Sequence, residues 1–343
     1  MLEEVGKLTF KEMEEPRPKK DEVIVRVKNC GICGSDIPRV YQDGAHRMPL
    51  IIGHEFSGVA ELEGSGVSGK WTGKKVGVYP LIPCRQCRPC LSGHYEMCRS
   101  YSYLGSRRDG GFAEYVAVPE WNLIEIPETV SCEQAAMLEP MSVAAHAVRR
   151  FDIPEDAKIA IYGQGTIGLF ILMLLLAQEN KNIFVFGNHD LQREKALELG
   201  LPREHFCDIR KEAVREWVDE RTAGEGFDTV FEAVGSEATY AQAVELSAPG
   251  GKLCLIGNPQ KDMGLKRDIY WKILRNQLTI AGTWNSSFGA DSDDWHYILK
   301  LLEEKRITPE KLISHRYPLE NIREGFQMMR DKKEDYIKIM TAT

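Results

Sequence analysis

The sequence predicts an α/β protein of two domains, a β-rich, barrel-like domain and a doubly wound parallel sheet. The chain has 343 residues, enough for two domains of ordinary size, and 43% of them are hydrophobic, enough for a sizeable core. Residues 5–118 form short strand patterns separated by glycine-rich turns. From Asp156 onward, short apolar strands alternate with helical stretches, which is typical of a parallel sheet covered by helices.

Three stretches of the β-rich part alternate apolar and polar residues with the period expected of a half-buried strand: 23–28, 56–62 and 112–118. The tail of the chain has a predicted helix at 295–302 and a last strand at 336–340. We expect this tail to pack on the first domain, because so small a unit would have little core of its own.

The second domain follows a regular strand–helix order. The predicted strands are 158–162, 183–186, 228–231, 252–256 and 278–282, and the predicted helices are 166–177, 191–199, 238–247 and 268–274. This alternation indicates a doubly wound sheet of parallel strands.

The charge composition argues against two classes of partner. Lys and Arg total 44 and Asp and Glu total 51, for a formal charge of -7, and no basic run occurs, so we expect no nucleic acid and no membrane as a partner. The longest apolar run, 167–177, is shorter than the roughly 18 residues of a membrane span, and the amino end lacks the layout of a signal peptide. We therefore expect a cytoplasmic protein that acts on a small molecule.

Nine cysteines, many of them in the first third of the chain, favour metal binding over disulfides in a reducing compartment. Cys84, Cys87, Cys90 and Cys98 lie within 15 residues, in a loop with little apolar content. Four thiolates at this spacing predict a closed, tetrahedral structural Zn2+ site. A nucleic-acid-binding zinc finger is the alternative, but the segment is short and has few arginines.

A second metal site is predicted from Cys33 and His54, each in a glycine-flanked turn at the end of a strand. Sulfur and imidazole are ligands that suit Zn2+. A buried thiol and a core histidine are the ordinary alternatives, which these two residues alone do not exclude. Glu55 does not belong to a metalloprotease helix, because Gly58 rather than a histidine stands three residues after it.

A dinucleotide site is predicted from a G-x-G-x-x-G segment that directly follows an apolar strand and opens a helix. Its residues are Gly163, Gly165, Thr166, Ile167 and Gly168. The first glycine turns the chain, the second admits the pyrophosphate, and the third allows the helix to pack closely on the strand. The amino end of the helix attracts the phosphate charge.

The part of this site that binds the ribose departs from the usual NAD pattern. No carboxylate stands at the end of the second strand, where Phe186 is followed by Gly187, although NAD sites usually have one there for the ribose 2′-hydroxyl. Its absence admits the 2′-phosphate of NADP, with Asn188 and Arg193 as candidate contacts. Asp190 is close enough in sequence to reach a 2′-hydroxyl, so NAD stays open and NADP is slightly favoured.

Several motifs together resemble those of the zinc-dependent medium-chain alcohol and polyol dehydrogenases, and the resemblance covers essentially the whole chain. They are Cys33-Gly-Ser-Asp36, Gly53-His-Glu55, the four-cysteine loop, Asp109-Gly-Gly-Phe-Ala-Glu-Tyr115, Glu139-Pro140 and the G-x-G-x-x-G segment. Leu138-Glu-Pro140 is similar to the sorbitol dehydrogenase branch, and the stretches 33–39, 43–46 and 105–111 resemble galactitol-1-phosphate 5-dehydrogenases.

The resemblance implies a GroES-like catalytic domain, formed by 1–145 with 284–343, and a Rossmann domain, 146–283, that binds NAD or NADP. Family members pair through the edge of the Rossmann sheet. The strand 278–282 is therefore expected to support a homodimer or a homotetramer.

The resemblance also implies roles for single residues. Cys33, His54 and Glu139 would hold a catalytic zinc, with Glu55 beside them, so that each subunit carries two zinc ions. Ser35 would take the proton of the substrate hydroxyl while a hydride passes to the nicotinamide.

The implied substrate is a polyol phosphate similar to galactitol 1-phosphate, converted at a secondary alcohol to a ketose phosphate. Arg39 and Arg108 are the candidate phosphate ligands, and Glu139 also faces the substrate in this scheme. Many relatives have a proton-relay histidine where this chain has Pro38 and Arg39, which makes His46 a candidate substitute. Two alternatives stay open, an unphosphorylated polyol such as sorbitol or L-iditol and a non-catalytic binding protein stabilised by the structural zinc.

Overall fold

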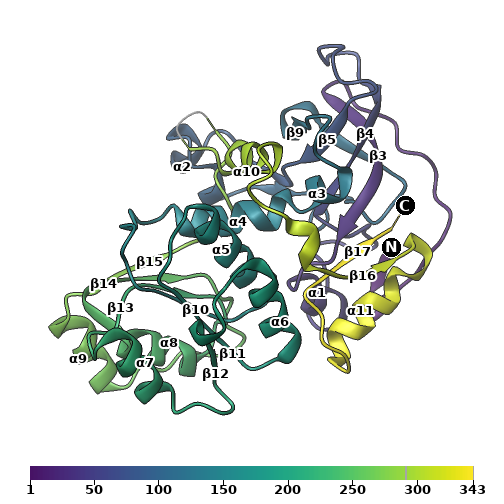
Figure 1. Ribbon diagram of the computed structural model, residues 1–343. Coiled ribbons are helices and arrows are strands. Elements are labelled where there is room, and N and C mark those ends of the chain that lie inside the picture. Colours follow the sequence, from purple (N-terminus) through teal and green to yellow (C-terminus); the bar gives the residue numbers. More distant parts are fainter. Residues whose placement is uncertain (290–291, 343) are drawn as a thin grey trace. The chain divides into compact units, whose positions relative to one another are not determined.

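The computed structural model describes residues 1–289 and 292–342, and its chain divides into two compact units. The first unit combines Met1–Ser142 with Ser286–Thr343, and the second is Val143–Asn285. In Figure 1 the first unit is drawn mainly in purple, blue and yellow and the second in teal and green. Each unit contains a sheet and helices, so the predicted α/β class is confirmed.

The first unit is built on a seven-stranded sheet with the order β16-β17-β3-β4-β5-β9, in which β8 also pairs with β3. These strands are β3 (Glu22–Gly31), β4 (Glu55–Glu63), β5 (Lys75–Val78), β8 (Tyr115–Pro119), β9 (Leu123–Glu125), β16 (Ile313–Tyr317) and β17 (Lys338–Thr341). All neighbours are antiparallel except β16 and β17. The pairing of Met340 with Gly31 brings the last strand of the chain beside β3.

Alternate side chains of this sheet form the core of the first unit. Val23, Val25 and Val27 of β3 are buried together with Phe56 and Ala60 of β4. Successive side chains of a strand point to opposite faces, so the period of two in the sequence is the pattern that a sheet covered on this face requires.

Short helices and two-stranded sheets complete the first unit. They are β1 (Leu2–Glu4), β2 (Lys7–Leu8), β6 (Leu81–Ile82), β7 (Ser102–Tyr103), α1 (Asp36–Tyr41), α2 (Arg88–Leu91), α3 (Cys132–Ala136), α10 (Asp294–Glu303) and α11 (Ile322–Asp331). Helix α3 starts with a capping box: the Gln134 backbone N–H donates to the Ser131 hydroxyl, and the Ser131 backbone N–H donates to the Gln134 side chain. Helix α4 (Leu138–Val148) begins in the first unit and continues into the second.

The second unit contains six parallel strands in the order β12-β11-β10-β13-β14-β15, so the predicted doubly wound sheet is confirmed. Its strands are β10 (Ile159–Tyr162), β11 (Ile183–Gly187), β12 (Phe206–Asp208), β13 (Phe227–Glu232), β14 (Ser247–Leu255) and β15 (Thr279–Gly282). Its other helices are α5 (Thr166–Ala177), α6 (Asp190–Leu199), α7 (Val214–Thr222), α8 (Glu237–Glu245) and α9 (Arg267–Arg275). The sequence patterns do not predict β12 or α7, and β12 has only three residues, too few for a period to show.

Helix α5 follows β10 directly and packs on it, and its residues 168–175 are all buried. This burial accounts for the longest apolar run of the chain. Among the described residues, no helix has both the length and the apolar character that a membrane span needs. Strand β10 lies between β11 and β13, where the strand order reverses, and ligands of open parallel sheets bind at the carboxyl ends of the strands at such a point.

Candidate functional site

Four cysteine sulfurs come together in the loop that contains α2. The ligand atoms of Cys84, Cys87, Cys90 and Cys98 all lie within 4.8 Å of one another, and the Sγ–Sγ distances of three pairs are 3.4, 3.9 and 3.9 Å. In a ZnS4 tetrahedron with Zn–S bonds of about 2.3 Å, the sulfurs are about 3.8 Å apart, so this cluster fits a structural zinc. Backbone N–H groups of Arg99 and Cys90 lower the pKa of the Cys87 thiol to about 6, which favours the thiolate that binds metal.

A second group of metal-binding side chains lies in the sheet of the first unit. The ligand atoms of Cys33, His54 and Glu55 lie within 4.8 Å of one another. Cys33 follows β3 and precedes α1, whereas His54 and Glu55 stand at the start of β4. The antiparallel pairing of Gly31 with Glu55 is what joins these two segments. Thiol, imidazole and carboxylate are the donor types that a catalytic Zn2+ uses, so the set fits that ion.

A buried aspartate holds this group in place. Asp36 accepts a hydrogen bond from the Cys33 backbone N–H at 3.2 Å and one from the Arg39 guanidinium, and its Oδ1 lies 3.5 Å from His54 Nδ1. Burial by itself would lower the pKa of His54, but Asp36 and Cys33 outweigh burial and raise it well above its usual range. The Arg39 side chain, predicted as a phosphate ligand, is only 19% exposed and points to Asp36.

Glu55 forms a buried ion pair with Lys338 of β17, and the Lys338 ammonium also donates to the Ile32 carbonyl at 3.1 Å. The sequence pattern of 336–340 does not indicate that Lys338 belongs to the site. Apolar and polar residues alternate in this strand, which predicts a side chain that faces solvent. In the structure all four residues of β17 are buried. Lys338 is therefore a site residue that sequence reasoning missed.

Glu139, predicted as a zinc ligand, lies near this group without belonging to it. Its carboxylate accepts a hydrogen bond from the Tyr103 hydroxyl at 3.2 Å, and the Tyr103 and His54 ring centroids are 5.7 Å apart. Burial and the charge of Glu55 together raise the pKa of Glu139 to about 7, although His54 and Lys338 act to lower it. Within the described residues, the carboxylate that stands within 4.8 Å of both Cys33 and His54 is that of Glu55.

Ser35, the predicted proton acceptor, is next to the candidate thiolate. It stands at the N-terminal cap of α1, and its Oγ donates a hydrogen bond to Cys33 Sγ at 3.3 Å. A substrate hydroxyl bound at the metal group would thus find a hydroxyl nearby that can accept and pass on a proton.

The predicted phosphate ligand Arg108 and its neighbour Arg107 have different partners. Arg108, predicted as a phosphate ligand, forms an ion pair with Glu22. Arg107 stacks on the Tyr101 ring, and its Nε is buried without a hydrogen-bond partner in the described chain. Burial, Arg107 and Arg39 all lower the pKa of His46, so both arginines lie close enough to His46 to disfavour its positive charge.

The glycine-rich segment has the geometry of a phosphate cradle. Gly163 has φ +86°, a conformation that favours glycine, and a side chain at Gly168 would overlap the Gly163 carbonyl. A Cβ at Gly165 would meet nothing within 4 Å, which is the open space that a pyrophosphate needs. Thr166 and Ile167 form the first turn of α5. The segment therefore fits a dinucleotide.

The predicted ribose contacts stand beyond β11. Asn188 is exposed directly after the strand, and the Arg193 guanidinium lies 6.0 Å from the centroid of the Phe206 ring.

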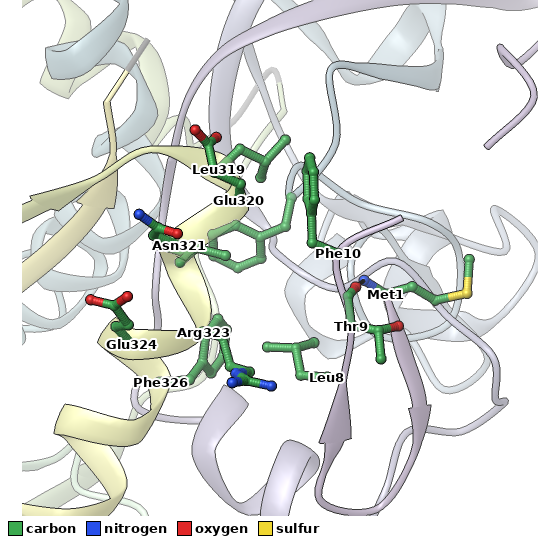
Figure 2. A pocket seen from close by; sticks show the side chains of 12 residues that line it. Met1, Leu8, Thr9, Phe10, Leu319, Glu320, Asn321, Arg323, Glu324 and Phe326 are labelled. Carbon is green, nitrogen blue, oxygen red and sulfur yellow. Dashed lines mark hydrogen bonds between the residues drawn. The ribbon is translucent and has the colours of Figure 1, made fainter. Parts of the chain in front are cut away.

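A cavity of about 330 Å³ lies elsewhere in the first unit, between the amino-terminal segment and α11 (Figure 2). Leu8, Phe10 and Phe326 give it apolar walls, and Arg323 and Glu324 give it charge. None of the predicted site residues lines it.

Comparisons with known proteins agree with both units. The alcohol dehydrogenase GroES-like domain matches residues 19–128, and the zinc-binding dehydrogenase domain matches residues 166–304. Galactitol 1-phosphate 5-dehydrogenase of Escherichia coli (strain K12) is 35% identical over 311 residues, covering 88% of this chain and 87% of that protein. The crystal structure of galactitol-1-phosphate dehydrogenase from Escherichia coli has a TM-score of 0.92 at 31% identity, covering 99% of this chain and 98% of that chain.

Two further crystal structures are similar over the whole chain. A zinc-binding dehydrogenase of Sinorhizobium meliloti 1021 bound to NADP has a TM-score of 0.90 at 26% identity, covering 100% of this chain and 98% of that chain. An alcohol dehydrogenase (rspB) of E. coli CFT073 complexed with NADH has a TM-score of 0.91 at 29% identity, with the same coverage. The protein is therefore a member of the zinc-dependent medium-chain alcohol and polyol dehydrogenase family.

Proposed function

We propose that the protein is a zinc-dependent, NAD(P)-linked dehydrogenase that oxidises a secondary alcohol of a polyol phosphate, such as galactitol 1-phosphate, to a ketose phosphate. One observation carries the proposal. The ligand atoms of Cys33, His54 and Glu55 lie close together, and the Ser35 hydroxyl donates a hydrogen bond to the Cys33 sulfur of this group. The glycine-rich segment of the second unit supports the nucleotide. The 35% identity to galactitol 1-phosphate 5-dehydrogenase supports the substrate class.

When bound, a catalytic zinc ion supplies Lewis-acid activation of the substrate hydroxyl. Cys33 and His54 would hold it, with Glu55 or Glu139 as the carboxylate ligand. Lys338 balances the charge of Glu55 and so limits the negative charge that the site presents to the metal.

The protein groups around that ion direct the proton and the geometry. Asp36 fixes the loop of Cys33 and the ring of His54, and Arg39 fixes Asp36. Ser35 Oγ would accept the proton of the substrate hydroxyl and pass it toward solvent. A bound nicotinamide would supply the hydride acceptor, so that the two-electron oxidation of the alcohol to a ketone is balanced by reduction of NAD(P)+.

A phosphate on the substrate would be recognised by the basic side chains near the Cys33 loop. Arg107 has a buried Nε with no partner in the described chain, and His46 and Arg39 add positive charge beside it. A guanidinium suits a phosphate because it donates charge-assisted hydrogen bonds in a fixed geometry. Arg108 is the weaker candidate, because Glu22 already neutralises it.

The test is a turnover screen of the zinc-loaded protein with galactitol 1-phosphate, galactitol, sorbitol and L-iditol, each with NAD and NADP. We expect the highest kcat/KM with the phosphate and about two zinc ions per chain. A higher kcat/KM with sorbitol or L-iditol would establish the unphosphorylated alternative, which the carboxylate partners of Arg39 and Arg108 favour. No turnover and about one zinc per chain would establish the non-catalytic alternative.

We also propose that two copies of the chain associate through the β15 edge. Strand β15 ends the order of the parallel sheet, and its only partner in the described residues is β14. Helix α9, which precedes it, exposes Tyr270, Trp271 and Leu274. Such a set of large apolar side chains is typical of a surface that is covered in an oligomer.

A further inference from the structure

An arginine that the sequence patterns do not single out lies where β11 and β12 end. The register of the two strands pairs Gly187 with Asp208. Arg210 donates from Nε to Asp208 Oδ1 at 2.8 Å and from Nη2 to Asp208 Oδ2 at 2.7 Å. The same Nη2 donates to Asp190 Oδ1 at 2.6 Å. Two carboxylates therefore share one guanidinium at the carboxyl edge of the sheet.

The two carboxylates hold Arg210 with different strength. The Asp208 side chain is 6% exposed and also accepts a hydrogen bond from the Arg210 backbone N–H at 3.1 Å. The Asp190 side chain is 70% exposed, so water and salt screen its contact. Asp208 thus fixes the guanidinium, while Asp190 can leave it at little cost.

Arg210 has donor capacity to spare. In the described chain its Nη1 makes no hydrogen bond, and Nη2 would regain a donor when Asp190 leaves. The Lys211 ammonium lies 3.3 Å from Asp208 Oδ2 and offsets the negative charge of that carboxylate. Once Asp190 has moved away, the local charge is positive.

The position matches the ribose end of a dinucleotide site. In folds of this kind, the group at the end of the second strand contacts the 2′ position of the adenosine ribose. Here that strand ends at Gly187, and because a Cβ there would stand 2.8 Å from Phe206 Cζ, the position takes glycine and supplies no side chain to the ribose. Arg210 reaches the same edge from the neighbouring strand.

We propose that Arg210 selects NADP, and that the 2′-phosphate of the cofactor replaces Asp190 on the Arg210 guanidinium. The inference rests on the proposed nucleotide site and adds to it the residue that chooses between the two cofactors. The exchange favours the phosphate, because a dianion forms stronger charge-assisted hydrogen bonds with a guanidinium than an exposed carboxylate does. NAD has no group that can make this exchange.

The test measures binding rather than turnover. Titration calorimetry of the full chain with NADP and NAD gives the two Kd values for the wild type, Asp190→Asn and Arg210→Met. We expect the wild type to bind NADP at least tenfold more tightly than NAD. Asp190→Asn should increase this preference severalfold, and Arg210→Met should abolish it by weakening NADP while leaving the Kd of NAD within about threefold.

A matched control is Arg215→Met, because Arg215 is also an exposed arginine paired with a carboxylate, Asp219, but lies in α7. It should change neither Kd. Arg210→Met removes the guanidinium partner of Asp208, leaving Lys211 as its ion-pair partner, and this loss lowers stability. Asp190→Asn keeps the Arg210–Asp208 pair and therefore decides between the outcomes if Arg210→Met does not fold. Equal or tighter binding of NAD by the wild type, or an unchanged preference in Asp190→Asn, overturns the inference. If neither NADP nor NAD binds, the proposed function itself is overturned.

Discussion

Cys33 is the residue on which catalysis should depend most directly. Its sulfur lies within 4.8 Å of the ligand atoms of His54 and Glu55, and the loop around it is held by Asp36 rather than by the metal. Cys33→Ser should therefore leave a folded protein with about one zinc per chain and a kcat/KM lowered by about 10³-fold or more, since a Lewis acid contributes several kcal/mol to the transition state. Zinc analysis, circular dichroism and steady-state kinetics measure the three quantities. Full activity in zinc-depleted Cys33→Ser protein would rule out the catalytic assignment.

Arg39 and Arg107 should respond differently to removal of their charge. Arg107→Met should raise KM for the hexitol phosphate about tenfold and leave the unphosphorylated hexitol unaffected, since a charge-assisted hydrogen bond contributes about 1.5–3 kcal/mol. Arg39→Met should lower kcat for both substrates, because it leaves buried Asp36 without its guanidinium partner and loosens His54. Kinetics with both substrates separate the two roles. Equal losses on both substrates in Arg107→Met would remove the phosphate assignment.

The residues of the candidate metal and nucleotide sites differ in how well the sequence reveals them. Cys33 and His54 stand in short motifs with glycines beside them, so their identity and spacing carry the prediction. Lys338 and Arg210 reach their sites because neighbouring strands pair in a particular register. The sequence of one strand does not show that register. A charged residue in a strand is ordinarily placed on the exposed face, which is why the buried Lys338 could not be predicted.

We expect the loop at 84–98 to depend on a bound metal more than on packing. Only two of its four cysteines are fully buried, and the only regular elements within the loop are the four-residue α2 and one short turn of helix. Cys90→Ser should therefore lower the free energy of unfolding by at least about 2 kcal/mol, because metal binding in such a loop is part of its folding energy. Thermal unfolding should show a Tm lower by about 5–10 °C.

Ser92→Ala is the control for this change, because Ser92 is exposed in the same loop and its hydroxyl donates only to the Arg88 carbonyl. Its Tm should match that of the wild type. If Cys90→Ser unfolds at the wild-type temperature with its zinc lost, the metal does not stabilise the loop.

The elements that the sequence predicts well are those with a long pattern or a clear boundary. Helix α5 is the best example, because its apolar run starts at a glycine-rich turn and is buried along most of its length. Strand β12 and helix α7 lack such signals. Strand β12 spans three residues, and its place in the sheet is set by pairing with β11 rather than by its own composition.

For the molecule as a whole, the exposed apolar face of helix α9 is a surface that calls for a partner. Helix α9 packs the partly buried Ile269 and Ile273 against the core of the second unit, but Trp271 and Leu274 remain exposed on it. A face of this kind costs free energy in water unless another surface covers it, and the unpaired edge of β15 offers backbone groups to the same partner.

Leu274→Glu should therefore shift the protein toward the monomer. Removing apolar area and adding a charge at a symmetric interface counts twice, once for each copy, so we expect the dimer Kd to rise by at least about 100-fold, equivalent to about 2.8 kcal/mol. Light scattering coupled to size-exclusion chromatography gives the mass. Leu62→Glu is the matched control, since Leu62 is an equally exposed leucine of β4 in the first unit, and it should leave the mass unchanged. A wild type that elutes as a monomer, or a Leu274→Glu variant that keeps the wild-type mass, would show that this face is not where two copies meet.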